Sequence, residues 1–509
     1  MSLILTPLTH PTVYGLRRHR YLCDTDAFLK GSLSTSSGEP VDLALVYTCK
    51  MVAEETEYGN VALSFNTVTF TTLHSPELGD LARVFQKLMF DGVRFVKAVI
   101  FNAVGYYLSK KSVAKLKDRY PQFAPLVDRM KDEEPATGDD LLNLARDRQG
   151  LYGEAPSVYW EFVDETLRLA ADDPEASPAV RDFVVPWNPR PRGHYDPPPA
   201  GLVEHQRRKL RSGFEIIDDR TKDWEIPSPS DLEKLTRLLK YTVRPVCPEA
   251  EVKQRFSAAA AAIYFLKSMS PHTCRHLRKL VILEDKRSLC NPESHALGLI
   301  PFCRDYPKLQ VERRVKLFTN VFLRGVTYEG RSERAWFGQY RQEPKGDLFS
   351  LNMTAAVAPW IIEASRLVEA GMPPGSFSLL LDSDGAGGLA SQIFESVVHR
   401  DVAWQEAWFA TFANGPSDLA WFDIRGDRRH SGRTPHFNHY VTPEDPARRL
   451  SWRPRPLLLR YSLNGGDRYL FENLPRAVRD IVEGKSITRC DFNPGTMWDV
   501  QAPVRQHEG

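Results

Sequence analysis

The sequence predicts a mixed fold, either α/β or α+β, in which helices and strands alternate irregularly. Three observations lead to this prediction. Residues 256–266 form an alanine-rich helical stretch, residues 276–284 form a short apolar run typical of a buried strand, and Asn464-Gly-Gly-Asp467 separates two apolar segments like the turn of a β-hairpin. Because these units recur with no fixed period, the sequence does not by itself predict a solenoid.

At 509 residues, the chain is long enough for several domains of roughly 100 to 200 residues each. Hydrophobic residues make up 42 % and charged residues 26 %, as in ordinary globular proteins and unlike disordered or membrane proteins. The predicted units are an N-terminal helix-strand domain at 1–130, an acidic and proline-rich connection with a short helix at 131–223, a central helix-strand core at 224–345, and a C-terminal helix-strand region with the hairpin at 346–509. The alternative is that 224–509 and 1–130 form one domain.

The N-terminal unit is predicted to alternate helix and strand. Residues 42–55 have apolar side chains at helical spacing, with Asp42 placed to cap the first turn, and residues 62–72 form a threonine-rich alternating strand. Residues 81–89 are amphipathic and predict a helix. Residues 93–101 are apolar almost throughout, so the pattern fits both a strand and a buried helix.

The connection at 131–223 has a composition shifted toward acids and prolines. Residues 186–199 carry proline at a density that blocks both helix and sheet hydrogen bonds, so we expect an extended chain there. Residues 159–170 nevertheless have the pattern of an amphipathic helix. Beyond the connection, Ser228 and the proline that follows it predict the start of another helix.

The central and C-terminal units continue the alternation. The elements predicted after the strand at 276–284 are an apolar segment at 296–302, a further segment of the helix-strand alternation at 309–315, a helix at 355–370, a strand at 376–381, a helix at 389–408 and hairpin strands at 456–463 and 468–471. Pro359 is expected near the start of its helix, because proline is tolerated in the first turn. Gly371 is expected to end that helix.

Charge and cysteine usage predict a soluble intracellular protein, cytoplasmic or nuclear. The net charge of +2 argues against nucleic acid as a partner, which usually requires a clearly basic chain. The seven cysteines include no Cys-x-x-Cys pair, which fits reduced thiols rather than a disulfide framework. The N-terminus lacks the features of a secretory signal, and no stretch approaches the roughly 20 apolar residues of a membrane span.

The densest group of soft metal ligands consists of three histidines and three cysteines. Zinc takes four such ligands in a tetrahedron. Their spacing lacks the tight cysteine pairs of structural zinc motifs, so we interpret them as buried thiols and surface histidines and predict no metal site and no cofactor. The group is His272, Cys274, His276, Cys290, His295 and Cys303.

Asp382 and Asp384 follow a predicted strand in the sequence Leu379-Leu-Leu-Asp-Ser-Asp-Gly385. A phosphatase of the haloacid dehalogenase type uses two such acids with Mg²⁺, one to attack phosphorus and one to handle the leaving group. The structural interpretation is a strand that runs into a turn, in which both acids cap the backbone. No downstream lysine and acid pair completes the set, so we predict no catalytic residue and keep a metal-dependent phosphatase as an alternative function.

Residues 425–455 form the one basic stretch that is interleaved with aromatic residues. Such a surface tracks a phosphate backbone while its rings stack on bases. The opposing interpretation is a solvated loop whose arginines pair with Asp427, Glu444 and Asp445, and the nearly balanced charge of the chain favours it. A nucleic-acid-associated regulator is therefore a second alternative function.

Several segments outside the proline-rich connection share a common likeness. They include Leu45-Val-Tyr-Thr-Cys-Lys-Met-Val-Ala-Glu-Glu55, Phe65-Asn-Thr-Val-Thr-Phe70, Trp224-Glu-Ile-Pro227, Arg255-Phe-Ser-Ala-Ala-Ala-Ala-Ala262, His276-Leu-Arg-Lys-Leu280, His295-Ala-Leu-Gly-Leu-Ile-Pro-Phe-Cys303 and Arg400-Asp-Val-Ala-Trp404. Together they resemble a large group of uncharacterised filamentous-fungal (ascomycete) proteins, many of them labelled F-box-like. The resemblance implies an adaptor that docks onto ubiquitin-ligase subunits and assigns no catalytic residue. Residues 9–33 lack the clear leucine- and proline-led helix of an F-box.

The function predicted from these observations is a non-catalytic protein-interaction or scaffold protein. Its partner is expected to be a protein, with ubiquitin-ligase subunits as the candidates that the resemblance implies. An accessory role in fungal metabolism or development is compatible with this prediction.

Overall fold

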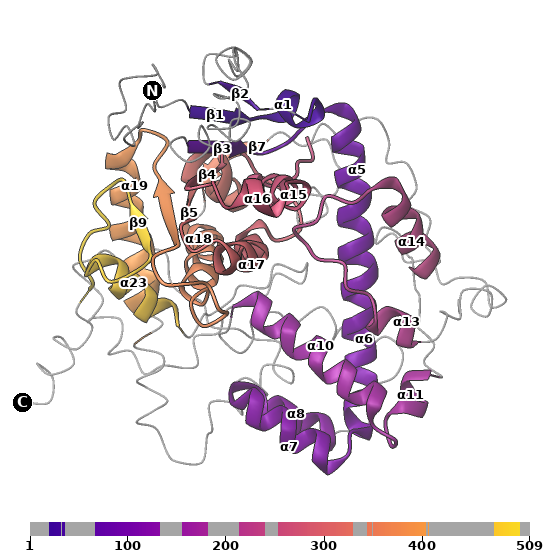
Figure 1. Cartoon of the computed structure of the whole chain (residues 1–509). Helices are drawn as coiled ribbons and strands as arrows, with labels where there is room; N and C mark the ends of the chain where they lie inside the picture. The colour runs from indigo at the N-terminus through magenta and orange to yellow at the C-terminus, as the bar shows by residue number, and fades with distance from the viewer. Residues whose placement is uncertain are drawn as a thin grey trace, which may run out of the picture.

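A seven-stranded sheet organises the molecule (Figure 1). The computed structural model describes residues 20–31, 33–35, 67–132, 155–181, 213–239, 253–328, 344–348, 350–403, 406 and 473–498. The strands are β1 (Arg20–Cys23), β2 (Ser34–Thr35), β3 (Thr67–Thr71), β4 (Lys279–Glu284), β5 (Gln310–Lys316), β8 (Phe377–Asp382) and β9 (Thr488–Cys490), in the order β2-β1-β3-β4-β5-β8-β9. All pairs are parallel except β1 with β2. The predicted mixed α/β class is confirmed.

The six parallel strands lie side by side in the order in which they occur in the chain. Parallel neighbours need crossovers, and crossovers are nearly always right-handed, so strands that are added on one side favour helices on one face of the sheet. Solenoid-type proteins share this arrangement. The irregular spacing of the strands conceals it in the sequence, because the crossover between β3 and β4 alone runs from residue 72 to residue 278.

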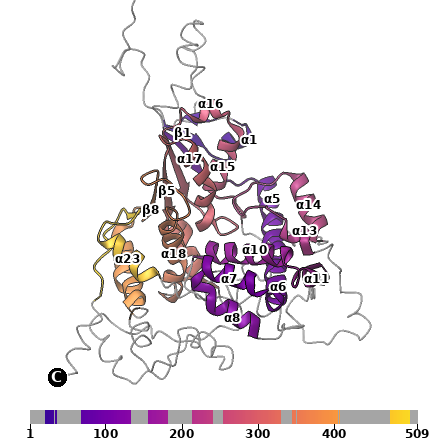
Figure 2. The same cartoon turned by 60° about the horizontal axis from the view of Figure 1, so that its bottom comes forward.

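That long crossover contains a layer of helices beside the sheet. The helices are α5 (Pro76–Lys87), η1 (Leu88–Arg94), α6 (Phe95–Val104), α7 (Lys110–Arg119), α8 (Ala124–Asp132), α10 (Pro156–Asp172), α11 (Ser177–Arg181), α13 (Gly213–Ile217) and α14 (Pro229–Leu239). Figure 2 shows α6, α7, α8, α10, α11 and α13 grouped together. Aromatic rings fill the centre of this layer, where the Phe123 and Phe162 centroids lie 4.5 Å apart and those of Phe101 and Phe162 lie 5.6 Å apart.

The segment at 93–101, for which the sequence left a strand and a buried helix open, belongs to helix α6. Residues Val96 to Phe101 are all buried. The helix is therefore covered on every side, which explains why its sequence shows no polar stripe. The predicted helices at 81–89 and 159–170 and the helix start at Ser228 are confirmed by α5, α10 and α14.

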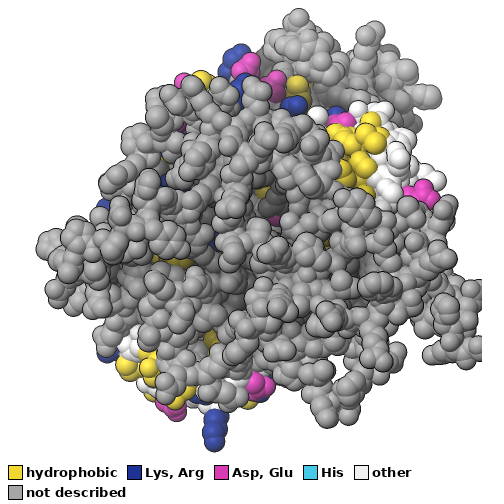
Figure 3. All heavy atoms as spheres, turned by 180° about the vertical axis from the view of Figure 1, so that it is seen from behind, with side chains coloured by type: hydrophobic (Ala, Val, Ile, Leu, Met, Phe, Trp, Pro, Cys, Tyr) yellow, Lys and Arg dark blue, Asp and Glu magenta, His cyan; other side chains and the backbone are white. Residues whose placement is uncertain are grey.

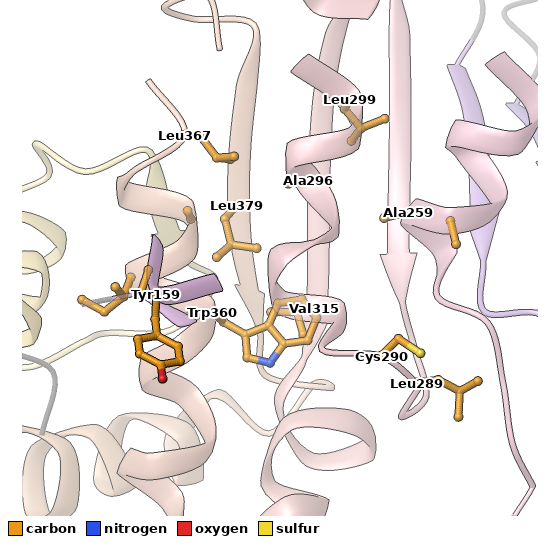
Figure 4. Close-up of a cluster of buried hydrophobic side chains, with 14 of the residues drawn as sticks. Tyr159, Ala259, Leu289, Cys290, Ala296, Leu299, Val315, Trp360, Leu367 and Leu379 are labelled. Atoms are coloured by element: carbon orange, nitrogen blue, oxygen red, sulfur yellow. The ribbon is translucent and has the colours of Figure 1, made fainter. Parts of the chain in front are cut away.

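The end of this crossover and the later crossovers supply the helices that pack on the sheet. They are α15 (Ala258–Ser268), α16 (Pro271–Cys274), η4 (Pro292–Leu299), α17 (Ile300–Asp305), η5 (Leu317–Val321), η6 (Phe322–Gly325), α18 (Ser350–Ser365), α19 (Gly387–Ile393), η8 (Phe394–Val398) and α23 (Leu474–Val482). The short helix α1 (Thr25–Leu29) follows β1, and β6 (Val326–Tyr328) pairs with β7 (Pro344–Leu348) apart from the main sheet. Figure 4 shows Val315 and Leu379 of the sheet close to Trp360 of α18.

Helix α15 lies close against the sheet because its first turns are built from alanine. The Ser257 hydroxyl accepts a hydrogen bond from Ala260 N at 2.9 Å and so caps the helix. Gly298 of η4 allows a similar close approach, since a Cβ there would lie 2.6 Å from both Ile263 and Trp224. Small residues at these positions therefore set the spacing between the helices and the sheet.

The predicted strands at 276–284 and 376–381 are confirmed by β4 and β8, and the unassigned segment at 309–315 forms β5. One prediction of detail is wrong: Pro359 lies inside α18, because this helix begins at Ser350. The sequence did not predict β1, β9 or α23, which are short. The predicted helix at 42–55, the proline-rich 186–199 and the hairpin at 456–471 lie outside the described residues.

Within the described ranges, the structure contains no helix that is both long enough and apolar enough to cross a membrane.

Candidate functional site

The two faces of the sheet differ in chemistry, as strand β5 makes plain. Val311, Arg313 and Val315 point toward the helices and are buried, whereas Glu312 and Arg314 point the opposite way and are half-buried. Successive side chains of a strand alternate between its two faces, so the consecutive charged residues of β5 lie partly in the buried interior and partly on the other face of the sheet. Parallel sheets that are covered on both faces carry nearly continuous apolar strands, and β5 does not.

The residues of the second face form a surface that we call the sheet face. It is defined by the register of β3, β4, β5, β8 and β9. Its members are Thr67, Thr69, Thr71, Lys279, Val281, Leu283, Gln310, Glu312, Arg314, Lys316, Ser378, Leu380, Asp382 and Arg489. Most are half-buried, Gln310 and Arg489 are exposed, and Val281 is buried. The sheet face is thus mainly polar, with leucines and a valine between hydroxyl and charged groups.

Charged side chains at the middle of the sheet face are paired across strands. Glu312 accepts hydrogen bonds from the guanidinium of Arg314 on the same strand and lies 3.1 Å from the ammonium of Lys279 on β4. Partial burial raises the pKa of Glu312, but the hydrogen bonds from Lys279 and Arg314 outweigh it and lower the pKa below its usual value. One carboxylate is therefore held between two cations, which remain 44 % and 41 % exposed.

The loops that follow the strands are joined by a row of polar contacts, which we call the carboxyl-end ladder. Asp285 after β4 accepts hydrogen bonds from the amide and hydroxyl of Thr72 after β3, at 3.1 and 2.9 Å. The Thr319 hydroxyl donates to the Asp285 carbonyl at 2.8 Å. Ser383 N donates to Asp491 at 2.9 Å and so links the loops after β8 and β9. Each strand end is thus tied to its neighbour.

Asp384, one of the two acids considered for phosphatase chemistry, is a member of this ladder. Its Oδ2 accepts hydrogen bonds from Phe318 N at 2.8 Å and Thr319 N at 3.0 Å, and its Oδ1 lies 2.9 Å from the ammonium of Lys316. Burial raises its pKa, but the hydrogen bond from Lys316 and those from the backbone outweigh burial and lower it. Both oxygens are therefore engaged in tying β8 to the loop after β5.

Asp382 supports the turn that holds Asp384. Its Oδ1 accepts a hydrogen bond from Asp384 N at 2.9 Å, and Asp384 has the left-handed backbone with φ of 56° that aspartate tolerates. These are the capping contacts of the structural interpretation. Among the described residues, no three His, Cys, Asp or Glu side chains are arranged to hold a metal ion.

The predicted histidine and cysteine group is spread over several environments. The rings of His272 and His276 lie 5.3 Å apart, at a helix end and on the approach to β4, whereas Cys274 between them is buried. Cys303 is buried in α17, where burial raises the pKa of its thiol to about 11. Cys290 is also buried, next to Asp223. The arginine-rich stretch at 425–455 lies outside the described residues.

A buried polar cluster lies on the opposite, helix-covered face, and the sequence did not predict it. The guanidinium of Arg313 donates to Glu284 Oε1 at 2.6 Å, and their side chains are 2 % and 0 % exposed. It also donates to the Pro292 carbonyl at 2.6 Å and lies 4.6 Å from the ring of Trp360. Glu284 in turn accepts from Ala258 N at 3.0 Å, at the start of α15. This ion pair is therefore fully hydrogen-bonded, as burial requires.

Ser257 and His295 belong to the same cluster. The Nε2 atom of His295 lies 2.7 Å from the Cys290 carbonyl, which only accepts, so Nε2 carries the proton and Nδ1 accepts from the Ser257 hydroxyl at 2.7 Å. Burial, followed by the charge of Arg313, lowers the pKa of His295 to about 3. A serine beside a neutral histidine is the pairing that activates a nucleophile. Here both side chains are only 1 % exposed, and the Ser257 hydroxyl also caps α15.

Signals for this cluster are present in the sequence. Glu284 ends an otherwise apolar strand, and Arg313 occupies an inward position between Val311 and Val315. A charge at an inward position needs a partner. The sequence does not say which partner, because Glu284 and Arg313 are 29 residues apart.

Comparison with protein families, with curated proteins and with solved structures finds no match for this chain. The functional argument therefore depends on the surfaces of the molecule itself. Seen from behind, the described side chains reach the surface in small groups that mix hydrophobic, basic and acidic residues (Figure 3). On the described part of the chain, the sheet face brings charged and hydroxyl side chains from five strands onto one surface.

Proposed function

We propose that this protein is a non-catalytic interaction or scaffold protein that binds a protein partner on the sheet face. One observation carries the proposal: a parallel sheet has helices on one face and polar, partly exposed side chains on the other. Burying a charged side chain without a partner costs free energy, so a protein that needs only a stable core has no reason to place charges there. One-sided parallel sheets with sequential strands use that arrangement to bind partners over an extended surface.

The resemblance to F-box-like fungal proteins supports a more specific version of the proposal. In that version, the chain is an adaptor in the cytoplasm or nucleus that brings a protein bound at the sheet face to ubiquitin-ligase subunits. The sheet face would then select the client, and another part of the chain would contact the ligase. The alternative phosphatase function is not what we propose, because Asp384 uses both carboxylate oxygens within the carboxyl-end ladder.

Affinity purification with chemical crosslinking tests this proposal. The full chain is expressed in fungal cells as the wild type, as a double variant with Lys279→Glu and Arg314→Glu, and as a control with Lys234→Glu and Arg237→Glu. The control makes the same charge change on exposed positions of α14, away from the sheet. We expect partners whose crosslinks map to β4, β5 or β8 to be lost only from the sheet-face variant.

The outcomes of this experiment are distinct. Recovery of ligase subunits by all three chains, with client loss from the sheet-face variant, supports the adaptor version. Partners that crosslink only to other elements and bind all three chains equally would contradict the proposal. Circular dichroism of the purified variants checks that the substitutions leave the fold intact.

A further inference from the structure

The distribution of charge on the sheet face restricts the kind of partner that fits it. Its charged members are Lys279, Arg314, Lys316 and Arg489 against Glu312 and Asp382, so basic groups are in the majority. Glu312 shows how the basic groups are used, since a carboxylate lies between Lys279 and Arg314. A surface that already holds one carboxylate between two exposed cations has the chemistry to hold others.

Arg489 extends this basic character across the sheet. It pairs in register with Leu380, which pairs with Arg314, so the two arginines lie in one row with one strand between them. Arg489 is exposed and makes no ion pair with any residue that the structure describes. Strands lie about 4.8 Å apart, so the two arginines are separated by about 10 Å across the row. This leaves an exposed cation aligned with the cluster of Lys279, Glu312 and Arg314.

The acidic groups of this part of the molecule lie just beyond the row of Arg314 and Arg489, toward the carboxyl ends of the strands. Asp285, Asp384 and Asp491 follow the strands in the carboxyl-end ladder, and Asp382 ends β8. The row that contains Arg314 and Arg489 lies nearer the amino ends of the strands than these acids do. An acidic ligand is therefore favoured along the row of Arg314 and Arg489 and disfavoured beyond it, where Asp285 and Asp491 lie.

We infer that the sheet face binds an extended acidic polypeptide segment that crosses the strands along the row of Arg314 and Arg489. This inference rests on the proposed function and names the chemistry of its partner. In an extended segment, side chains on one side repeat about every 7 Å, so acidic residues at alternate positions reach both the cluster at Arg314 and the cation at Arg489. The hydroxyl group of Thr71 in this row and those of Thr69 and Ser378 in the next row offer hydrogen bonds to its backbone.

Fluorescence anisotropy with labelled peptides tests the inference on the full chain. The probes are twelve-residue peptides of alternating Glu and Ser, of alternating Gln and Ser, and of alternating Lys and Ser. We expect only the Glu-Ser peptide to bind, with affinity falling as salt concentration rises. The variants Arg314→Gln and Arg489→Gln should each weaken binding about threefold to tenfold, whereas Arg237→Gln on α14 should leave it unchanged.

The variant Glu312→Gln gives the most specific test of the inference. Because Glu312 occupies Lys279 and Arg314, its neutralisation frees both cations, and the Glu-Ser peptide should bind about threefold to tenfold more tightly. A structural role for Glu312 alone would weaken binding or leave it unchanged. Equal binding of all three peptides, or loss of Glu-Ser binding in Glu312→Gln, would overturn the inference.

A labelled oligothymidylate separates polypeptide from nucleic acid. If it binds more tightly than the Glu-Ser peptide and with the same dependence on Arg314 and Arg489, the acidic polypeptide is the wrong ligand class. Failure here is distinguishable from failure of the proposed function. If peptides do not bind but cellular partners still crosslink to β4, β5 or β8, the sheet face is an interaction surface for a partner of other chemistry.

Discussion

Arg313 and Arg314 are neighbours in the chain, yet each pairs with a glutamate in a different environment. The side chain of Arg313 is 2 % exposed and joins Glu284 inside the buried polar cluster, whereas that of Arg314 is 41 % exposed and joins Glu312 on the sheet face. The alternation of side chains along a strand separates them. The same chemical pair thus stabilises the interior on one face and leaves charge available for binding on the other.

The buried pair should be the more sensitive of the two. Glu284→Ala leaves Arg313 buried without its partner and also removes the acceptor for the first amides of α15. We expect the free energy of unfolding to fall by about 3 to 5 kcal/mol, measured by urea denaturation. The double variant Glu284→Leu with Arg313→Met should be more stable than Glu284→Ala, because it leaves no unpaired charge. If Glu284→Ala lowers the free energy of unfolding by less than about 1 kcal/mol, the buried pair contributes no more than an exposed pair, and the proposed difference between the two faces is wrong.

Glu363 of α18 extends the comparison to a carboxyl that is buried at the contact between α18 and α10. It accepts hydrogen bonds from the amide and hydroxyl of Ser157 at 2.9 and 2.6 Å. Burial raises its pKa from 4.5 to about 7, against the opposing effects of Arg366 and Ser157. Because the folded-state pKa is the higher one, its protonation favours folding below pH 4.5, and this contribution is lost as the pH rises through 7.

Removing the carboxyl group of Glu363 should reduce the dependence of the free energy of unfolding on pH. Relative to wild type, Glu363→Gln should gain about 2 to 3 kcal/mol of stability between pH 4.5 and pH 8, measured by urea denaturation across that range. Glu161→Gln is the matched control, because Glu161 also contacts Arg366 but is 49 % exposed. If the free energy of unfolding of both variants depends on pH in the same way as that of the wild type, burial does not govern the titration of Glu363.

Asp384 lies between the two extremes, at the edge of the sheet face. Asp384→Ala removes the acceptor for Phe318 N and Thr319 N and places a residue with no polar side chain at φ of 56°. We expect a loss of about 2 kcal/mol at pH 7 and a smaller loss for Asp384→Asn, since asparagine tolerates this backbone and keeps one acceptor. Because the folded-state pKa of Asp384 is lowered, its contribution is present above the unfolded value and disappears as pH falls.

The contribution of Asp384 to the free energy of unfolding can be measured through its dependence on pH. The difference between wild type and Asp384→Ala in urea denaturation should shrink as the pH is lowered from 7 toward 3. Equal stabilities for all three chains at pH 7 would mean that the carboxyl-end ladder does not hold the strand ends together.

The smallest effect on stability is expected on the sheet face itself. Arg314→Ala should change the free energy of unfolding by less than about 1 kcal/mol, since exposed ion pairs contribute little in water. The same variant should weaken partner binding on the sheet face. A stability loss as large as that of Glu284→Ala would show that Arg314 is structural, and the two faces would then be alike.

Local patterns in the sequence predicted most of the regular elements that pack on the sheet. The strands at 276–284 and 376–381 and the helices at 81–89 and 159–170 follow from the pattern of their apolar residues. The sequence did not predict strands β1 and β9, because their four and three residues are too few to show a period. Both edge strands, β2 and β9, were missing from the prediction, as was β1 beside β2.

The candidate site depended on contacts that local patterns do not contain. The sequence singles out Asp382 and Asp384 as two acids that follow a strand. Their roles in a turn and in the carboxyl-end ladder depend on contacts with each other and with the loop after β5, which the sequence does not show. Ser257 and His295, which are 38 residues apart, attracted no attention as a pair.

Composition and periodicity alone determined the mixed class of this protein and the faces of its strands, because burial of apolar side chains is a local property of spacing along the chain. Tertiary structure decided the order of the strands, which side of the sheet received helices, and which glutamate Arg313 meets. These are matters of long-range pairing, and the free energy that selects one pairing over another comes from packing and desolvation between segments that the sequence places far apart.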